Sequence, residues 1–251
     1  MNQRTPLIAG NWKMYKTVGQ ATDAARRLVA AGGGVTHTEV MIAPAFTALS
    51  AVSAVLADSD IYMGAQNMFW ASEGAFTGEI SASMLTDVGC RHVIIGHSER
   101  RHLFGESDDL IARKVKAALD ADLIPVLCVG ETESERETKK TFSILDKQVE
   151  SGLKDLIPEA GREPVIAYEP VWAIGTGKTA QPEQVGEVHS FLRDLIARRF
   201  GEALAGAIRI LYGGSVKPEN ISALMSLTDV DGALVGGASL DPEIFTRIIN
   251  F

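Results

Sequence analysis

Residues 167–178 read AYEPVWAIGTGK, a stretch that contains the end of a strand and the loop after it. A short apolar run leads to a single carboxylate, Glu169, and a proline follows at once. Beyond it, an apolar tip centred on Trp172 precedes a Gly-Thr-Gly-Lys hinge at 175–178. A carboxylate at a strand end suits general-base chemistry, and an apolar segment with a flexible end can close over the base and exclude water. The alternative is an ordinary strand-to-helix loop whose tryptophan packs on a neighbour.

On both sides of this stretch the chain alternates between short apolar runs and longer amphipathic segments. The amphipathic segments, which we expect to be helices, include Val18–Ala31, Leu110–Leu119, Val185–Phe200 and Pro242–Ile249. The eight runs that we expect to be strands are Leu7–Gly10, Val40–Ala43, Ile61–Gly64, Val93–Gly96, Pro125–Val129, Val165–Tyr168, Ile208–Leu211 and Ala233–Val235.

Strands separated by helices predict an α/β fold with a parallel sheet, and eight such units in 251 residues match a closed (β/α)8 barrel. A doubly wound open sheet is the alternative. It would place a G-x-G-x-x-G turn after the first strand, where this chain has Gly10-Asn11-Trp12-Lys13. Because no linker or composition break interrupts the pattern, we expect residues 1–251 to form one catalytic domain.

Composition and charge limit the classes of protein to consider. The formal net charge is −8 and no lysine/arginine cluster offsets it, which argues against nucleic acid as a partner. No apolar run follows Arg4, and no stretch approaches the ~18 residues of a membrane span, so we expect no signal peptide and no membrane contact. The two cysteines, Cys90 and Cys128, lack a CxxC spacing, which predicts a reduced, cytoplasmic protein. If the substrate is an anion, a local site must attract it, because the global field does not.

Polar residues gather where the predicted strands end. Asn11 and Lys13 follow the first strand, His97 begins the sequence His-Ser-Glu-Arg after the fourth, and Glu169 follows the sixth. The carboxyl ends of barrel strands meet at one mouth, so these groups should converge there. An amide, an ammonium, an imidazole and a carboxylate together suit proton transfer next to a carbonyl. Taken singly, a lone histidine or lysine at such a position is more often structural.

Glycine-rich turns follow the last two strands, at Gly213-Gly214-Ser215 and Gly236-Gly237. They can be simple tight connections. Alternatively, their N–H groups can bind a phosphate, and the loops after strands seven and eight of barrels often do so.

Three other signals point to no separate function. Gly177-Lys178-Thr179 resembles the end of a phosphate-binding P-loop, but that motif needs glycine at position 172, where Trp172 stands. The sequence has no HExxH or similar cluster, so we expect no metal. The charged run Glu131–Lys140 is predicted to be a solvated loop and helix start.

With these residues in place, the chain resembles the triosephosphate isomerase family over its whole length. Tyr15, and Ser81-Ala82-Ser83, depart from residues common in that family; the second departure could alter a local helix start. The matching segments are Gly10–Met14 (GNWKM), Gly64–Asn67 (GAQN), Gly74–Glu79 (GAFTGE), Ile95–Arg101 (IGHSERR), Cys128–Thr132 (CVGET), Ala167–Gly177 (AYEPVWAIGTG), Tyr212–Val216 (YGGSV) and Gly232–Ala238 (GALVGGA).

The resemblance implies a TIM barrel that interconverts dihydroxyacetone phosphate and D-glyceraldehyde 3-phosphate in glycolysis and gluconeogenesis, without cofactor or metal. It implies that Glu169 moves a proton between the two carbons, while a neutral His97 shuttles protons between oxygens; this family is a standard example of that neutral imidazole. Lys13 and Asn11 would stabilise the enediolate, and Glu99 would orient Lys13 or carry protons itself. The N–H groups at four positions would bind the phosphate: Gly175, Ser215, Gly236 and Gly237.

Residues 66–79 form an unusually long connection for a compact barrel, and they contain Met68, Phe69, Trp70 and Phe76. The segment can fold onto its own barrel. The resemblance implies instead that it makes a homodimer, with Thr77 reaching the partner subunit's site.

Two rival functions remain from the residues alone. A Schiff-base aldolase would need a lysine at the end of strand six, where Glu169 stands. A phosphosugar-binding barrel without catalysis would not need Glu169, His97 and Lys13 together.

Overall fold

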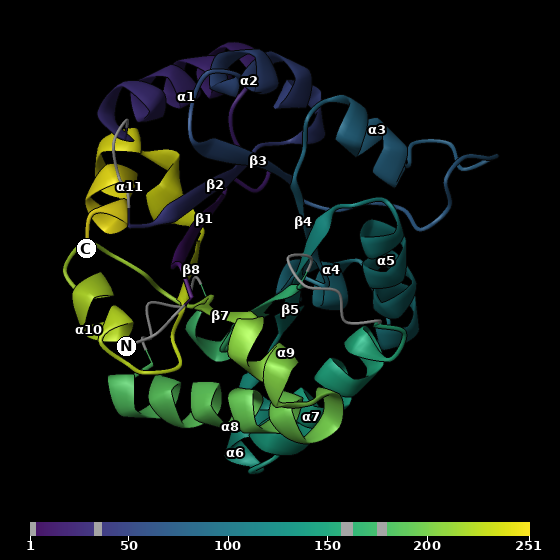
Figure 1. Cartoon of the computed structure of the whole chain (residues 1–251), viewed down its shortest axis with the longest axis vertical. Coiled ribbons are helices and arrows are strands. Elements are labelled where there is room, and N and C mark those ends of the chain that lie inside the picture. Colours follow the sequence, from purple (N-terminus) through teal and green to yellow (C-terminus); the bar gives the residue numbers. More distant parts are fainter. Residues whose placement is uncertain (1–3, 33–36, 157–162, 175–179) are drawn as a thin grey trace.

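A computed structural model describes residues 4–32, 37–156, 163–174 and 180–251 of the chain. Eight parallel strands form one closed barrel in which β8 pairs with β1, and helices surround it (Figure 1). This confirms the predicted (β/α)8 fold, and each predicted strand lies within one residue of its observed ends. The strands are β1 (Leu7–Asn11), β2 (Glu39–Ala43), β3 (Ile61–Ala65), β4 (His92–Ile95), β5 (Ile124–Val129), β6 (Val165–Tyr168), β7 (Arg209–Tyr212) and β8 (Gly232–Val235).

The predicted helices are present, with ends that lie up to three residues from the expected ones. The larger differences arise at the amino ends, where Ser107 and Gln181 cap helices ahead of their first apolar residue. The α-helices of the described residues are α1 (Val18–Gly32), α2 (Leu49–Leu56), α3 (Ala82–Asp87), α4 (Ser98–Leu103), α5 (Asp108–Asp120), α6 (Glu133–Glu137), α7 (Thr141–Leu153), α8 (Pro182–Phe200), α9 (Glu202–Ala207), α10 (Ile221–Met225) and α11 (Pro242–Ile249). Short 3-10 turns are η1 (Phe46–Ala48), η2 (Val171–Ala173) and η3 (Gly237–Leu240).

The strands carry apolar side chains on both faces, because one face fills the barrel and the other packs against the helices. Val165 and Ala167 of β6 belong to the small cluster inside the barrel, whereas Ile166 and Tyr168 belong to the large cluster outside it. Side chains alternate along a strand, so the next inward position after Ala167 is Glu169. The same alternation carries β1 from Leu7 and Ala9 to Asn11. The strand period therefore places both polar groups at the mouth.

One glycine lets the ends of β5 and β6 lie close together at this mouth. A Cβ at Gly130 would come within 1.8 Å of the backbone oxygen of Glu169. No side chain fits in that space, so residue 130 must be glycine for Glu169 to hold its position.

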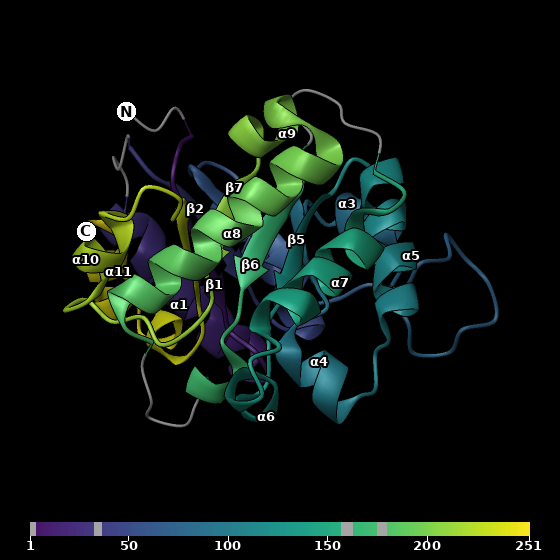
Figure 2. The ribbon, with the colours of Figure 1, turned by 90° about the horizontal axis from the view of Figure 1, so that it is seen from below.

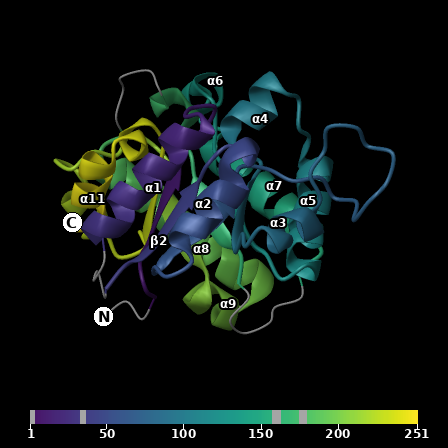
Figure 3. The same ribbon diagram turned by 90° about the horizontal axis from the view of Figure 1, so that it is seen from above.

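The connection from β3 to α3 projects away from the body of the molecule in Figures 2 and 3. Its root packs on its own barrel: Met68 is buried, and the rings of Phe69 and Trp70 stack with centroids 3.8 Å apart. The reading that the segment folds onto its own barrel therefore holds for its root, and residues 72–79 remain exposed. At its end, Ser81 caps α3 by accepting a hydrogen bond from the N–H of Met84, so the helix forms at the unusual serine-rich sequence.

Two further findings bear on the surroundings of the protein. Among the described residues, no helix combines the length and apolar character needed to cross a bilayer. Cys90 and Cys128 are both buried and neither forms a disulfide.

Candidate active site

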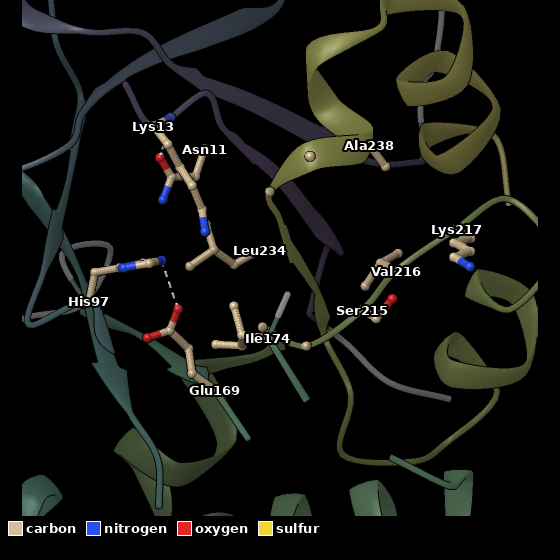
Figure 4. A pocket seen from close by; sticks show the side chains of 14 residues that line it. Asn11, Lys13, His97, Glu169, Ile174, Ser215, Val216, Lys217, Leu234 and Ala238 are labelled. Carbon is tan, nitrogen blue, oxygen red and sulfur yellow. Dashed lines mark hydrogen bonds and ion pairs between the residues drawn. The ribbon is translucent and has the colours of Figure 1, made fainter. Parts of the chain in front are cut away.

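A cavity of about 290 Å³ opens at the carboxyl ends of the strands. Seven of the predicted site residues line it, contributed by five strand ends. Figure 4 shows His97 and Glu169 on one side of the cavity and Ser215 on the other. Its lining residues are Asn11, Lys13, His97, Glu169, Ile174, Gly213, Gly214, Ser215, Val216, Lys217, Leu234, Gly236, Gly237 and Ala238.

Two predicted residues that the structure describes do not line the cavity. Glu99 lies beside it, in contact with Lys13 and His97. Thr77 lies in the exposed part of the projecting segment. Gly175, and with it the 175–178 hinge, lies outside the described residues.

Glu169 is buried and held at both carboxylate oxygens. Oε2 accepts a hydrogen bond of 2.8 Å from the backbone N–H of Ser98, and Oε1 lies 3.0 Å from His97 Nε2. Burial raises the pKa of Glu169, but His97, the Ser98 N–H and Lys13 together bring that pKa below its ordinary value. The side chain is therefore a carboxylate at neutral pH, as a general base must be.

His97 is the N-cap residue of α4, and this placement determines its tautomer. Its Nδ1 accepts a hydrogen bond of 3.2 Å from the backbone N–H of Glu99, so the ring hydrogen belongs on Nε2, where it faces Glu169. Burial lowers the pKa of His97, but the adjacent Glu169 carboxylate raises it, to a net value above the ordinary one. The N-terminus of α4 alone would lower the pKa of His97, and the Glu169 carboxylate outweighs that effect.

Contacts hold Lys13 in place at both its backbone and its side-chain ammonium. Its φ of +50° lies in the left-handed region, which a non-glycine residue rarely adopts. Asn11 Oδ1 accepts a hydrogen bond of 3.0 Å from the Lys13 N–H, and Lys13 Nζ lies 2.6 Å from Glu99 Oε1. Gln66 Nε2 donates to the carbonyl oxygens of Lys13 and Ala43, each at 2.8 Å. Sequence reasoning assigned Gln66 no role, although it stands where β3 ends, as the other site residues do on their strands.

The two glycine-rich turns form the far side of the cavity. Asn220 Nδ2 donates a 3.0 Å hydrogen bond to the Ser215 carbonyl and so holds the first turn. In the second, a Cβ at Gly236 would lie 3.3 Å from Lys13 Cε, closer than most side chains tolerate. Backbone N–H groups of such turns suit an anion, because no side chain keeps the ligand away.

Glu131 corrects the prediction of a solvated charged run. The helix start is confirmed, because Thr132 and Glu135 form a capping box at α6. Glu131 itself is fully buried, however, and accepts hydrogen bonds from Tyr168 Oη and from Trp172 Nε1 at 3.0 Å. Arg136 adds an ion pair at 3.1 Å. The carboxylate therefore belongs to the base of the loop that follows Glu169, where donors from neighbouring strand ends satisfy it.

The described residues contain no group of three or more histidine, cysteine, aspartate or glutamate side chains that could hold a metal ion. The groups present suit removal of a proton from carbon by a carboxylate, with cationic and N–H donors for the oxygens and an anion-binding turn beyond them.

Comparisons with known proteins agree with this arrangement. The family model described as triosephosphate isomerase matches residues 6–251. The chain is 54% identical to the triosephosphate isomerase of Endomicrobium trichonymphae over 248 residues, which cover 99% of both chains. It is also 54% identical to that of Geobacter metallireducens and 52% identical to that of Chloroflexus aurantiacus, with 99% of each chain covered in both cases.

Proposed function

The chain belongs to the triosephosphate isomerase family, whose reaction interconverts dihydroxyacetone phosphate and D-glyceraldehyde 3-phosphate, and we propose that Glu169, His97, Lys13 and Asn11 carry out that reaction here. The whole of 1–251 then acts as one catalytic domain. The observation that carries the assignment is the buried Glu169 carboxylate, 3.0 Å from His97 Nε2, in a cavity that Lys13 also lines.

Glu169 takes a proton from the carbon next to the substrate carbonyl and returns it to the other carbon. The pKa of such a carbon acid is far above that of a carboxylic acid, so the enediolate needs strong stabilisation. In the resting arrangement the Nε2–H of His97 faces Glu169. A substrate oxygen bound between them takes over that hydrogen bond, and His97 then passes protons between the two oxygens.

Lys13 supplies positive charge to the developing oxyanion, and its pairing with Glu99 at 2.6 Å orients its ammonium. Asn11 uses its amide oxygen for the N–H of Lys13, which leaves Nδ2 to donate to a substrate oxygen. Gln66 supports the strained backbone of Lys13 from β3. Three elements thus prepare the oxyanion site before substrate enters, which avoids reorganisation during the reaction.

The phosphate is assigned to the glycine-rich side, where Ser215, Gly236 and Gly237 line the cavity and their N–H groups would bind it. Gly175 is assigned the same role from the family pattern. Anchoring the phosphate there places the carbonyl end of a three-carbon substrate toward Glu169 and His97, because these groups lie on the other side of the cavity (Figure 4).

The rival functions fit less well. Glu169 occupies the strand-six position that an aldolase would give to a Schiff-base lysine. A barrel that only binds phosphosugars has no use for a buried carboxylate paired with an imidazole.

We assign the active form to a homodimer made through residues 66–79. Support comes from the exposure of Phe76, in a segment that projects from the body (Figure 3). Exposed Met14, Phe46 and Met84 follow β1, β2 and β3, which are neighbours in the barrel, so this side of the barrel carries further exposed apolar side chains. The glycolytic substrate and the free buried cysteines favour a cytoplasmic location.

The decisive experiment uses D-glyceraldehyde 3-phosphate with a coupled assay for dihydroxyacetone phosphate, repeated in D2O with NMR detection. We expect turnover without added cofactor, and deuterium at the carbon that loses and regains the proton. Glu169→Gln should abolish both signals. Turnover of Glu169→Gln at the wild-type rate would exclude Glu169 as the base.

A further inference from the structure

Positive charges at the cavity can attract a phosphorylated substrate from solution. The chain has a formal net charge of −8, which repels a phosphorylated substrate at long range. Two lysines, Lys13 and Lys217, line the cavity. Lys13 Nζ lies 2.6 Å from Glu99 Oε1, so from outside the site the two charges largely cancel. Lys13 can act on an oxyanion in contact with it, but it contributes little to attracting an anion from solution.

Lys217 is different, because its ammonium has no ion pair with any carboxylate in the described part of the chain. Its side chain is exposed, and Figure 4 shows it beyond Val216, on the Ser215 side of the cavity and away from His97 and Glu169. Its positive charge therefore lies next to the turn assigned to the phosphate.

The backbone of Lys217 is fixed to that same turn. Its N–H donates a 2.8 Å hydrogen bond to Asn220 Oδ1, and its carbonyl accepts from the N–H groups of Asn220 and Ile221, both at 3.1 Å. Asn220 also holds the Ser215 carbonyl through Nδ2. One asparagine thus ties the root of Lys217 to the turn, so the charge stays near the cavity even though the side chain is exposed.

We propose that Lys217 is an electrostatic recruitment residue for the phosphate group of the substrate. It attracts the dianion to the glycine-rich side of the cavity and favours the orientation in which the phosphate leads. Its role is binding, and it takes no part in the proton transfers. This rests on the proposed function, because it is the triose phosphate that supplies the dianion.

The expected size of the effect follows from Coulomb's law. A single charge and a dianion about 8–10 Å apart in water interact by an energy that corresponds to a change in affinity of roughly three- to fivefold at low ionic strength. The Debye length falls from ~30 Å at 0.01 M salt to well below 10 Å at 0.5 M, so the effect should then nearly disappear.

The test compares Lys217→Gln with the wild-type enzyme from 0.01 to 0.5 M salt. We expect kcat/KM for D-glyceraldehyde 3-phosphate to fall about three- to fivefold at low salt and less than about twofold at high salt, with kcat unchanged. Lys217→Arg should behave as wild type. The control is Lys116→Gln, which removes the same charge from an exposed position on α5, where Lys116 pairs with Asp120 at 2.6 Å.

The dissociation constant of inorganic phosphate, measured by calorimetry over the same salt range, gives a readout that does not need turnover. It should rise in Lys217→Gln with the same salt dependence, even if the proposed reaction were wrong. The proposal fails if both glutamine variants show the salt dependence of the wild type. It also fails if Lys217→Gln lowers kcat equally at all salt concentrations, because that result indicates a disturbed turn.

Discussion

The Glu169–His97 contact determines the chemistry at the scale of single residues. Each group changes the protonation of the other: the imidazole lowers the pKa of the carboxyl, and the carboxylate raises the pKa of the ring. Because Glu99 N–H occupies Nδ1 of His97, the hydrogen on Nε2 is directed at the position where a substrate oxygen must bind. The contact with His97 thus keeps Glu169 ionised, whereas it is the Glu99 N–H donated to Nδ1 that favours the neutral ring.

The first prediction concerns the position of the base. Glu169→Asp keeps the charge but withdraws the carboxylate by one methylene, and a misplacement of ~1 Å can cost about 10²-fold in rate. We expect kcat to fall by about that factor or more, with KM little changed, in steady-state kinetics. Glu187→Asp, at an exposed position of α8, is the control and should behave as wild type. Activity of Glu169→Asp within twofold of wild type would remove Glu169 from the role of base.

A second prediction concerns the charge of His97. Because Nδ1 accepts an N–H, we expect 15N NMR at pH 7 to show a neutral ring with its hydrogen on Nε2. Glu169→Gln removes the charge that raises the pKa of His97, while burial and Lys13 still lower it. The ring should therefore titrate at lower pH in the variant than in the wild type. An unchanged titration curve would show that the carboxylate does not control the imidazole.

At the scale of elements, the barrel brings together groups that lie far apart in sequence. Glu131 follows β5, whereas its donors Tyr168 and Trp172 lie on β6 and η2. Since β5 and β6 are paired strands, one buried carboxylate can hold the first turn of the loop that follows Glu169. Glu169, the proposed general base, thus lies between β6 and η2, and Glu131 holds η2 in place.

A third prediction follows from this anchor. Glu131→Gln keeps the shape of the side chain but replaces the carboxylate, which only accepts hydrogen bonds, with an amide. The amide NH2 group would then face the donors of Tyr168, Trp172 and Arg136. We expect the free energy of unfolding, measured with urea, to fall by about 1–3 kcal/mol, because buried donors lose a charged acceptor. The emission maximum of Trp172 should shift as well, because its indole N–H loses the charged acceptor. The signal of Trp172 is obtained by subtracting the emission of a Trp172→Phe variant. Glu187→Gln is the matched control, and equal stability of the two variants would contradict the anchoring role.

Features of the fold and site that follow from a periodic sequence pattern could be predicted from the sequence. Features that depend on a contact between residues far apart in sequence could not. Strand ends follow from apolar runs, so the positions of Asn11, His97 and Glu169 at one mouth could be predicted. The burial of Glu131 could not, because a charged residue beside other charged residues carries no local signal of the Tyr168 and Trp172 donors on β6 and η2. The role of Gln66 also depends on contacts between three strands. Sequence gives the site's chemical groups, but not the partners that hold them.

At the scale of the whole molecule, the functions of the barrel are divided between its ends and its sides. The strand mouth holds the chemistry, whereas the projecting segment 66–79 lies at the side, on the opposite flank of the barrel from α11 (Figure 1). Within that segment the stacked Phe69 and Trp70 make a firm root, and the rings of Phe69 and Phe76 lie 4.5 Å apart. An aromatic core that leads to an exposed tip is suited to insertion into a second copy of the chain.

The last prediction tests that association. Phe76→Glu with Thr77→Glu places two charges on the exposed tip, while Gly78 is kept because its φ of +93° strains any other residue. We expect light scattering to show a monomer and turnover to fall by at least about tenfold, because a partner's Thr77 no longer supports Asn11 and His97. Ile244→Glu, at another exposed apolar position, on α11, is the control and should remain dimeric and active. A folded monomeric variant with undiminished turnover would show that each barrel completes its own site, and a wild-type chain of monomer mass would remove the dimer altogether.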